Sequence, residues 1–167
     1  GIIFAGVVAT CVAAAVKDPE ATAKGVGQGV KRFGTNLGRK TKRTTDKAVD
    51  RREKLLGTIE QELTIHTRIE EEIFYPAFRE AARKKDDTKL YFEALEEHHV
   101  VDMVLPEIKG TDAESEQFAA KAKVLKDLVE HHAEEEETEM FPRARKLMTR
   151  DELLRLGGEM ARLKQSM

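Results

Sequence analysis

The sequence predicts an all-α fold, and three observations carry that prediction. Charged residues make up 36% of the 167 residues, tryptophan is absent, and apolar residues recur over long stretches at the spacing of one helix face. Long solvated faces of this kind are typical of helices and not of a sandwich of short apolar strands. No segment has a convincing strand pattern, and the length suits one sizeable domain with an extension.

Composition and charge both change near residue 50. Residues 1–54 hold 12 lysines and arginines against 5 acidic residues, together with seven of the eleven glycines, whereas residues 55–167 hold 17 against 26. A shift of this kind indicates two regions with different roles. We therefore expect an extension over residues 1–45, apolar at first and then rich in glycine and basic residues, followed by a helical domain over residues 46–167.

The extension has two parts of different character. Residues 1–16 are apolar but fall short of the roughly 20 residues that a membrane-spanning helix needs, so a signal-peptide core and a buried helix both stay open. The basic run at residues 31–43 contains one aromatic residue, which favours a solvated linker over weak contact with an anionic membrane. No specific nucleic-acid binding is predicted. We expect a cytoplasmic protein, with export or N-terminal membrane association as alternatives.

The rest of the chain is expected to be helical in four segments, which are residues 45–76, 90–108, 116–147 and 151–164. Pro76 should kink or end the first of them, because proline lacks a backbone N–H and its ring clashes with the preceding turn. The polar stretch at residues 83–89 is predicted to be the turn before the second segment, and Gly110 should close that segment.

An internal repeat is the most informative feature of the sequence. HTRIEEEIFYP at 66–76 and HAEEEETEMFP at 132–142 superpose without a gap. In each copy a glutamate follows the histidine by four residues, so both side chains lie on one helix face and can reach one ion. A third cluster lies between the copies, in EALEEHHVVDMVLPEI, and the three clusters together contain all five histidines of the chain.

These clusters predict a metal site whose ligands are nitrogen and oxygen. The chain has a single cysteine, Cys11, which excludes a thiolate zinc site built from this chain alone. Imidazole and carboxylate ligands suit iron, manganese or zinc, and the core of a helix bundle is a usual place for a carboxylate-bridged metal pair. The sequence has no HExxH motif and no nucleophile-elbow context, which argues against hydrolysis.

The same segments resemble the hemerythrin-like HHE cation-binding family over roughly residues 50–148. The resemblance rests on H-x-x-x-E-E with an aromatic-proline ending, seen twice, and on the histidine-bearing segment between the copies. It implies an up-down bundle with a non-haem di-iron centre, in which two iron ions share an oxo or hydroxo bridge. The ligands that it implies are His66, Glu70, His98, His132 and Glu136, with Asp102 as a substitute ligand.

The chain departs from the family's pattern in its first helix, which normally contributes a further histidine. No histidine precedes His66, so the first bundle helix is expected to be divergent or incomplete and to come from the N-terminal segment, the C-terminal tail or a partner subunit. Within the second motif, His131 with Glu135 is an alternative to His132 with Glu136, although the distance to the proline favours the latter pair.

The resemblance implies a protein that binds or senses dioxygen or a related small oxidant, and an oligomer is compatible with it. One alternative is a non-haem iron enzyme that turns over peroxide or oxygen. Another is a membrane- or surface-associated helical protein with a degenerate or zinc-occupied site. We favour a metal- and oxygen-binding protein over an enzyme. Tyr75 is assigned to core packing, with tuning of a nearby metal as the alternative.

Overall fold

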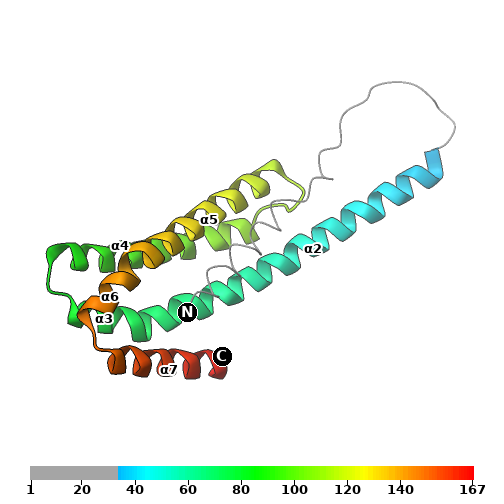
Figure 1. The fold of residues 1–167 in the computed structure, drawn as a ribbon. Helices are drawn as coiled ribbons and strands as arrows, with labels where there is room; N and C mark the ends of the chain where they lie inside the picture. Colours follow the sequence, from blue (N-terminus) through cyan, green and yellow to red (C-terminus); the bar gives the residue numbers. More distant parts are fainter. Residues whose placement is uncertain (1–33) are drawn as a thin grey trace.

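The structure is a computed structural model of the 167-residue chain, and it describes the backbone from Gly34 to Met167 and the side chains from Asp46 onward. The described part consists of helices joined by short connections and contains no strand (Figure 1). The all-α bundle prediction is therefore confirmed. The expectations for the apolar start and for the glycine-rich stretch up to residue 33 fall outside the described residues.

Six α-helices and two π-helical turns follow one another along the described chain. They are α2 (Gly34–Ile69), η2 (Glu70–Phe74), α3 (Tyr75–Ala81), α4 (Lys85–Lys109), α5 (Glu116–Glu135), η3 (Glu136–Met140), α6 (Phe141–Leu147) and α7 (Arg150–Ser166). The elements α2, η2 and α3 form one continuous helical rod, and so do α5, η3 and α6. Each copy of the sequence repeat therefore lies on its own rod, with a π-helical turn in its middle.

The helices α2, α4 and α5 run up and down beside one another, and α7 folds back against the end of α2 (Figure 1). The first half of α2 extends past the other helices of the bundle. Of the expected sources for the remaining bundle helix, the described part supplies the C-terminal tail, because α7 packs against α2 and η2. None of the described helices is long and apolar enough to cross a membrane.

Two apolar cores fill the bundle, one at each end. One joins α2, α4 and α5 and includes Ile59, Ile108 and Leu125, which are at most 2% exposed. The other joins η2, α3, α4, η3, α6 and α7 around Tyr75 and Phe78, both fully buried. Each of the helices α2, α4 and α5 places one buried histidine between the two cores. The apolar contacts therefore hold a polar layer in the middle of the bundle.

Local chemistry explains where the helices begin and end. Ser115 accepts a hydrogen bond from the backbone N–H of Phe118 and starts α5, and Thr149 forms a reciprocal capping box with Glu152 at the start of α7. Gly110 follows the last residue of α4, as predicted.

The turn predicted at residues 83–89 is wrong in its extent, because α4 already begins at Lys85. The carboxylate of Asp87 accepts hydrogen bonds from the backbone N–H groups of Lys84, at 3.0 Å, and Arg83, at 3.3 Å. These bonds satisfy donors that the first turn of a helix leaves free, so the polar residues start the helix instead of forming a loop.

Pro76 does not end the rod, because the chain stays helical from α2 through η2 to the end of α3. It lies in the first turn of α3, directly after the π-helical turn η2, and Pro142 has the same place in α6 after η3. The first turn of a helix tolerates proline, because its missing N–H would have no α-helical partner there. The wider π-helical turn thus lets the helical rod continue through the proline.

Candidate metal centre

Three histidines and one glutamate meet in the polar layer between the two cores. His66 and Glu70 come from the first rod, His98 from α4 and His132 from α5, and each is at most 9% exposed. Each offers one ligand atom that lies within 4.8 Å of the ligand atoms of the other three. Buried polar groups cost free energy unless they find partners, so their convergence in an otherwise apolar interior marks a functional site.

Two outer carboxylates fix the orientation of two of the imidazoles. Nδ1 of His98 lies 2.9 Å from Oε1 of Glu71, and Nδ1 of His132 lies 2.7 Å from Oε2 of Glu97. The Nε2 atoms of the two rings face each other at 3.2 Å. A carboxylate that accepts a hydrogen bond from Nδ1 leaves Nε2 available as a ligand, an arrangement common behind metal-bound histidines.

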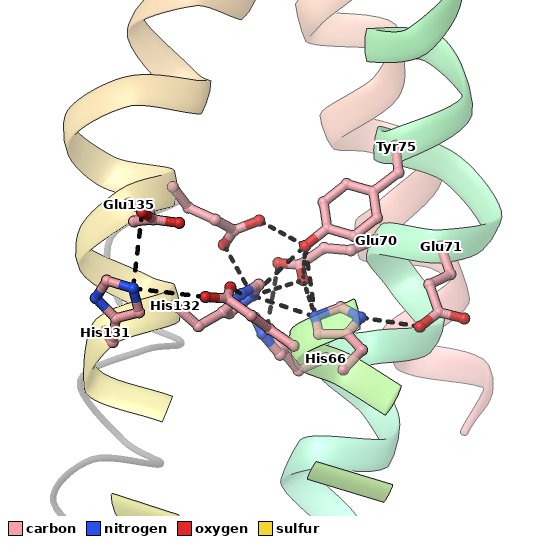
Figure 2. A network of polar contacts seen from close by, with 10 residues as sticks. His66, Glu70, Glu71, Tyr75, His131, His132 and Glu135 are labelled. Carbon is pink, nitrogen blue, oxygen red and sulfur yellow. Dashed lines mark hydrogen bonds and ion pairs between the residues drawn. The ribbon is translucent and has the colours of Figure 1, made fainter. Parts of the chain in front are cut away.

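His66 adds the third imidazole to the group. Its ring packs edge-on against the rings of His98 and His132, with centroids 5.5 Å away in both cases. Nδ1 of His66 lies 3.1 Å from Oε1 of Glu70, one helical turn along the same rod. Oε2 of that glutamate lies 3.3 Å from Nε2 of His98. The same oxygen lies 3.9 Å from Nε2 of His132, so Glu70 lies beside imidazoles from three helices (Figure 2).

The π-helical turn brings Tyr75 into the same layer. In a regular α-helix, a residue five positions after Glu70 would be rotated from it by roughly 140°. In η2 the backbone N–H of Tyr75 instead bonds to the carbonyl of Glu70, so the turn absorbs one extra residue. The tyrosine hydroxyl then lies 3.4 Å from Oε2 of Glu70, and it is 3.4 Å from Nε2 of both His98 and His132.

Glu136 adjoins the group through the same hydroxyl. Tyr75 donates a 3.0 Å hydrogen bond to Oε1 of Glu136, and Oε2 of this glutamate lies 3.8 Å from Nε2 of His132. Glu136 is 4% exposed. The structure thus brings five of the six predicted ligands together and leaves out Asp102, whose side chain is exposed on α4.

Charge is distributed unevenly over the buried groups. Although burial opposes ionisation of Glu70, the charge of His66 and the nearby imidazoles of His132 and His98 lower its pKa to about 2. Burial and the nearby charge of Glu70 raise the pKa of Glu136 to about 8. Two carboxylates that share a small volume thus take different charge states, as repulsion between like charges requires.

The pKa values of two of the histidines are also shifted in opposite directions. Burial lowers the pKa of His66 to about 4, and the attraction of Glu70 offsets only part of this effect. Burial also disfavours charge on His132, but the nearby carboxylate of Glu70 and the hydrogen bond to Glu97 outweigh it and raise the pKa of that imidazole to about 10. Burial, together with the negative charges of Glu70 and Glu136, raises the pKa of Tyr75 far above its usual value.

The donor set fits a transition-metal ion. Three imidazoles and a carboxylate, without a thiolate, are ligands that suit iron, manganese and zinc. Apolar residues of similar size would pack in this layer at less cost, so its buried polar groups indicate a role in binding. His66, Glu70, His98 and His132 are the residues that could hold such an ion.

A second histidine-containing group lies outside this layer. His131 and Glu135 of α5 and Glu97 of α4 offer ligand atoms within 4.8 Å of one another. In Figure 2, His131 and Glu135 lie beside α5, to the left of the labelled residues of the buried group. The structure therefore buries His132 and leaves its neighbour His131, the alternative inward-facing residue, with its side chain 61% exposed.

The sequence does not reveal the parts of the site that depend on the π-helical turn or on residues that contact the candidate ligands from outside. For Tyr75 the sequence favours core packing over a place beside the metal, whereas in the structure the ring lies in the core and the hydroxyl reaches the polar layer. The spacing of the motif does not distinguish a surface residue from a neighbour of the site at Glu71, which in the structure contacts Nδ1 of His98. The repeat itself held one usable signal, because a tyrosine stands in the first copy where the second has Phe141.

Comparison with known proteins agrees with this geometry. Residues 29–144 match the family described as the hemerythrin HHE cation binding domain, and because this is more than half of the chain, the chain belongs to that family. A curated relative described as a DNA nickase, from Nostoc sp. (strain PCC 7120 / SAG 25.82 / UTEX 2576), is 32% identical over 85 residues. The match covers 51% of this chain but 23% of the relative, so the chain spans far less than that relative's length. No solved structure matches the chain.

Proposed function

We propose that this chain is a non-haem iron protein that binds or senses dioxygen or a related small oxidant. The observation that carries the proposal is the convergence of four buried donors, from three helices, within 4.8 Å of one another. A bound iron would supply a redox-active centre able to take a small oxidant as a further ligand. Membership of a cation-binding family supports the same conclusion.

His66, Glu70, His98 and His132 are the residues we assign to the first ion. Glu136 lies beside them and supplies a carboxylate that a second ion requires, so a pair of irons is part of the proposal. Glu71 and Glu97 hold the rings of His98 and His132 with Nε2 toward the centre. Asp102 is not included, because its side chain is exposed.

The space at the site favours a very small ligand over an organic substrate. A cavity of about 10 Å³ is lined by residues that include His132, Glu136 and Met140. A volume of this order has room for about one water molecule. A dioxygen-sized molecule would enter with a small movement of side chains, whereas an organic substrate would need the bundle to open. This supports binding or sensing over turnover of a larger substrate.

DNA nicking, which the name of the Nostoc relative describes, is not carried over to this chain. The match reaches only 23% of that protein. The groove outside the buried layer is lined by four glutamates, which are Glu93, Glu96, Glu97 and Glu135, and a single lysine. Carboxylates repel the phosphate backbone, and nucleic-acid binding depends on neutralising it with basic residues. We therefore expect no specific nucleic-acid binding at this face.

The deciding experiment measures metal content and the visible spectrum in air of protein purified without chelator. We expect bound iron with a charge-transfer band in the wild-type protein, and at least a severalfold lower iron content in His66→Ala. His99→Ala is the matched control, because His99 is an exposed histidine of α4 and should keep the wild-type content. Equal iron in all three proteins would overturn the assignment, and zinc in place of iron would overturn the oxygen-related part.

A further inference from the structure

The outer group repeats the inner one at the surface of the bundle. His131 and Glu135 are four residues apart on α5, as are His132 and Glu136, so the outer pair is the inner pair rotated by roughly 100° about the helix. The side chain of His131 is 61% exposed and that of Glu135 is 33% exposed. Glu97 of α4 faces the outer pair with a side chain that is 21% exposed. An ion could therefore reach this group directly from solvent.

The distances within the outer group suit ligands better than hydrogen-bond partners. Nε2 of His131 lies 3.7 Å from Oε1 of Glu97 and 3.7 Å from Oε1 of Glu135. Both distances are too long for hydrogen bonds. Two ligands that each lie about 2.1 Å from one tetrahedral ion are separated by roughly 3.4 Å. A small inward movement would thus allow all three side chains to bind one divalent cation.

The surroundings of the outer group attract cations. A groove of about 530 Å³ opens beside it, and its lining contains four glutamates and one lysine, Lys89. This lysine is already paired with Glu93, at 2.8 Å. A groove lined by one sign of charge raises the local concentration of ions of the opposite sign and their rate of association.

Glu97 joins the outer group to the buried layer. Its Oε1 faces His131, whereas its Oε2 lies 2.7 Å from Nδ1 of His132. A cavity of about 10 Å³ also joins the two groups, because its lining includes Glu97 and Glu135 of the outer group together with His132 and Glu136 of the buried layer. Oxygen and nitrogen donors therefore follow one another from the solvent-facing groove to the centre of the bundle.

We propose that Glu97, His131 and Glu135 form a second, solvent-facing site for a divalent cation, which captures the ion and passes it to the buried centre. The proposal rests on the proposed function, since it requires a buried centre to be loaded. It assigns the outer residues a role in uptake, through a binding site weaker than the buried centre, and no role in holding the ion of the buried centre. A step of this kind gives the ion ligands that replace its water before it enters the apolar interior.

The test follows Co²⁺ uptake by metal-free protein, using the visible absorption that the ion gains with histidine and carboxylate ligands. We expect His131→Asn to load several times more slowly than the wild-type protein at low Co²⁺, with an unchanged final amount in the buried centre. His99→Asn, a second exposed histidine replaced in the same way, should load at the wild-type rate. Equal loading rates in all three proteins would overturn the proposal.

A second measurement separates this proposal from the one on which it rests. Equilibrium dialysis with Co²⁺ should show a weaker binding site remaining in His66→Ala and lost in His66→Ala/His131→Asn. If the wild-type protein binds no more Co²⁺ than His66→Ala, the buried centre and the uptake route both fail. If the wild-type protein binds more, but the two variants bind equally, the buried centre stands and the outer site is refuted.

Discussion

The hydroxyl of Tyr75 donates a 3.0 Å hydrogen bond to Oε1 of Glu136, which lies 61 residues further along the chain. This bond connects the two copies of the sequence repeat, since each residue lies in or next to the π-helical turn of its own rod. It is a bond between buried groups, so its removal leaves the carboxyl group of Glu136 in the interior without that donor. Through this hydrogen bond, Tyr75 belongs to the polar layer as well as to the apolar core.

Tyr75→Phe should destabilise the metal-free protein by about 1–3 kcal/mol, the cost of leaving a buried polar group without its partner. The free energy of unfolding measured in urea provides the test. Tyr91→Phe is the matched control, because Tyr91 packs against the same core and its hydroxyl has no hydrogen bond to any described residue. Similar losses in the two variants would contradict the assigned role of the Tyr75 hydroxyl.

Glu71→Ala should weaken iron binding by about 10–100-fold, because the ring of His98 loses the carboxylate that orients it. Glu72→Ala should leave the affinity near that of the wild-type protein, since Glu72 pairs with Arg68 on an exposed part of the rod. Affinity is measured by competition with a chelator of known strength. Equal affinities of the two variants would show that the contact between Glu71 and His98 does not support the metal.

Removal of the metal should lower the thermal stability of the protein. An ion that binds only the folded bundle stabilises it by mass action, which amounts to about 2.7 kcal/mol at an ion concentration one hundred times the dissociation constant. Melting curves before and after chelation measure the difference. In His66→Ala the two curves should nearly coincide, and a wild-type melting point that does not respond to chelation would argue against a well-formed site.

Asp87→Asn should destabilise the bundle by about 1–2 kcal/mol near neutral pH, because the carboxylate bonds two backbone N–H groups and Arg143. Burial opposes ionisation of Asp87, but the bonds from Lys84, Arg83 and Arg143 outweigh it and lower the pKa of this carboxyl. Its contribution is therefore full above the unfolded-state pKa near 4 and is lost as the pH falls through the lower folded-state value.

The pH dependence can be measured as a difference between proteins. The gap in unfolding free energy between wild-type protein and Asp87→Asn should be constant from pH 7 to about pH 5 and should narrow below about pH 4. Asp86→Asn is the control, because Asp86 is the exposed neighbour in the same helical turn. A gap that stays unchanged at pH 3 would refute the role of the ionised carboxylate.

Much of the fold and the residues of the buried layer could be predicted from the sequence, because the repeat carries its own register. His66 with Glu70 and His132 with Glu136 occupy equivalent positions of HTRIEEEIFYP and HAEEEETEMFP, and the structure places both pairs inside the bundle. The apolar periodicity likewise predicted the long helices. These features depend on local spacing, which a single sequence displays directly.

The features that could not be predicted depend on contacts between helices or on irregular backbone. Asp102 follows His98 by four residues and so should share its face, yet the packing of α4 leaves Asp102 exposed. The pairing of Glu97 with His132 joins residues 35 positions apart, and spacing alone does not reveal it. The early start of α4 depends on the cap that Asp87 provides, which polar composition hides.

The two π-helical turns also change how the sequence must be compared with those of relatives. Glu70 and Phe78 are eight residues apart and both buried, as are Glu136 and Ala144. In a regular α-helix, two residues eight positions apart point in directions that differ by roughly 80°, whereas two residues seven positions apart differ by roughly 20°. Each π-helical turn therefore contains one residue more than a regular α-helix would need to keep both side chains on the buried face. A helical wheel drawn straight through either motif misplaces every later residue by roughly 100°. An alignment to a relative without such a turn therefore needs a one-residue gap between the glutamate and the proline of each copy.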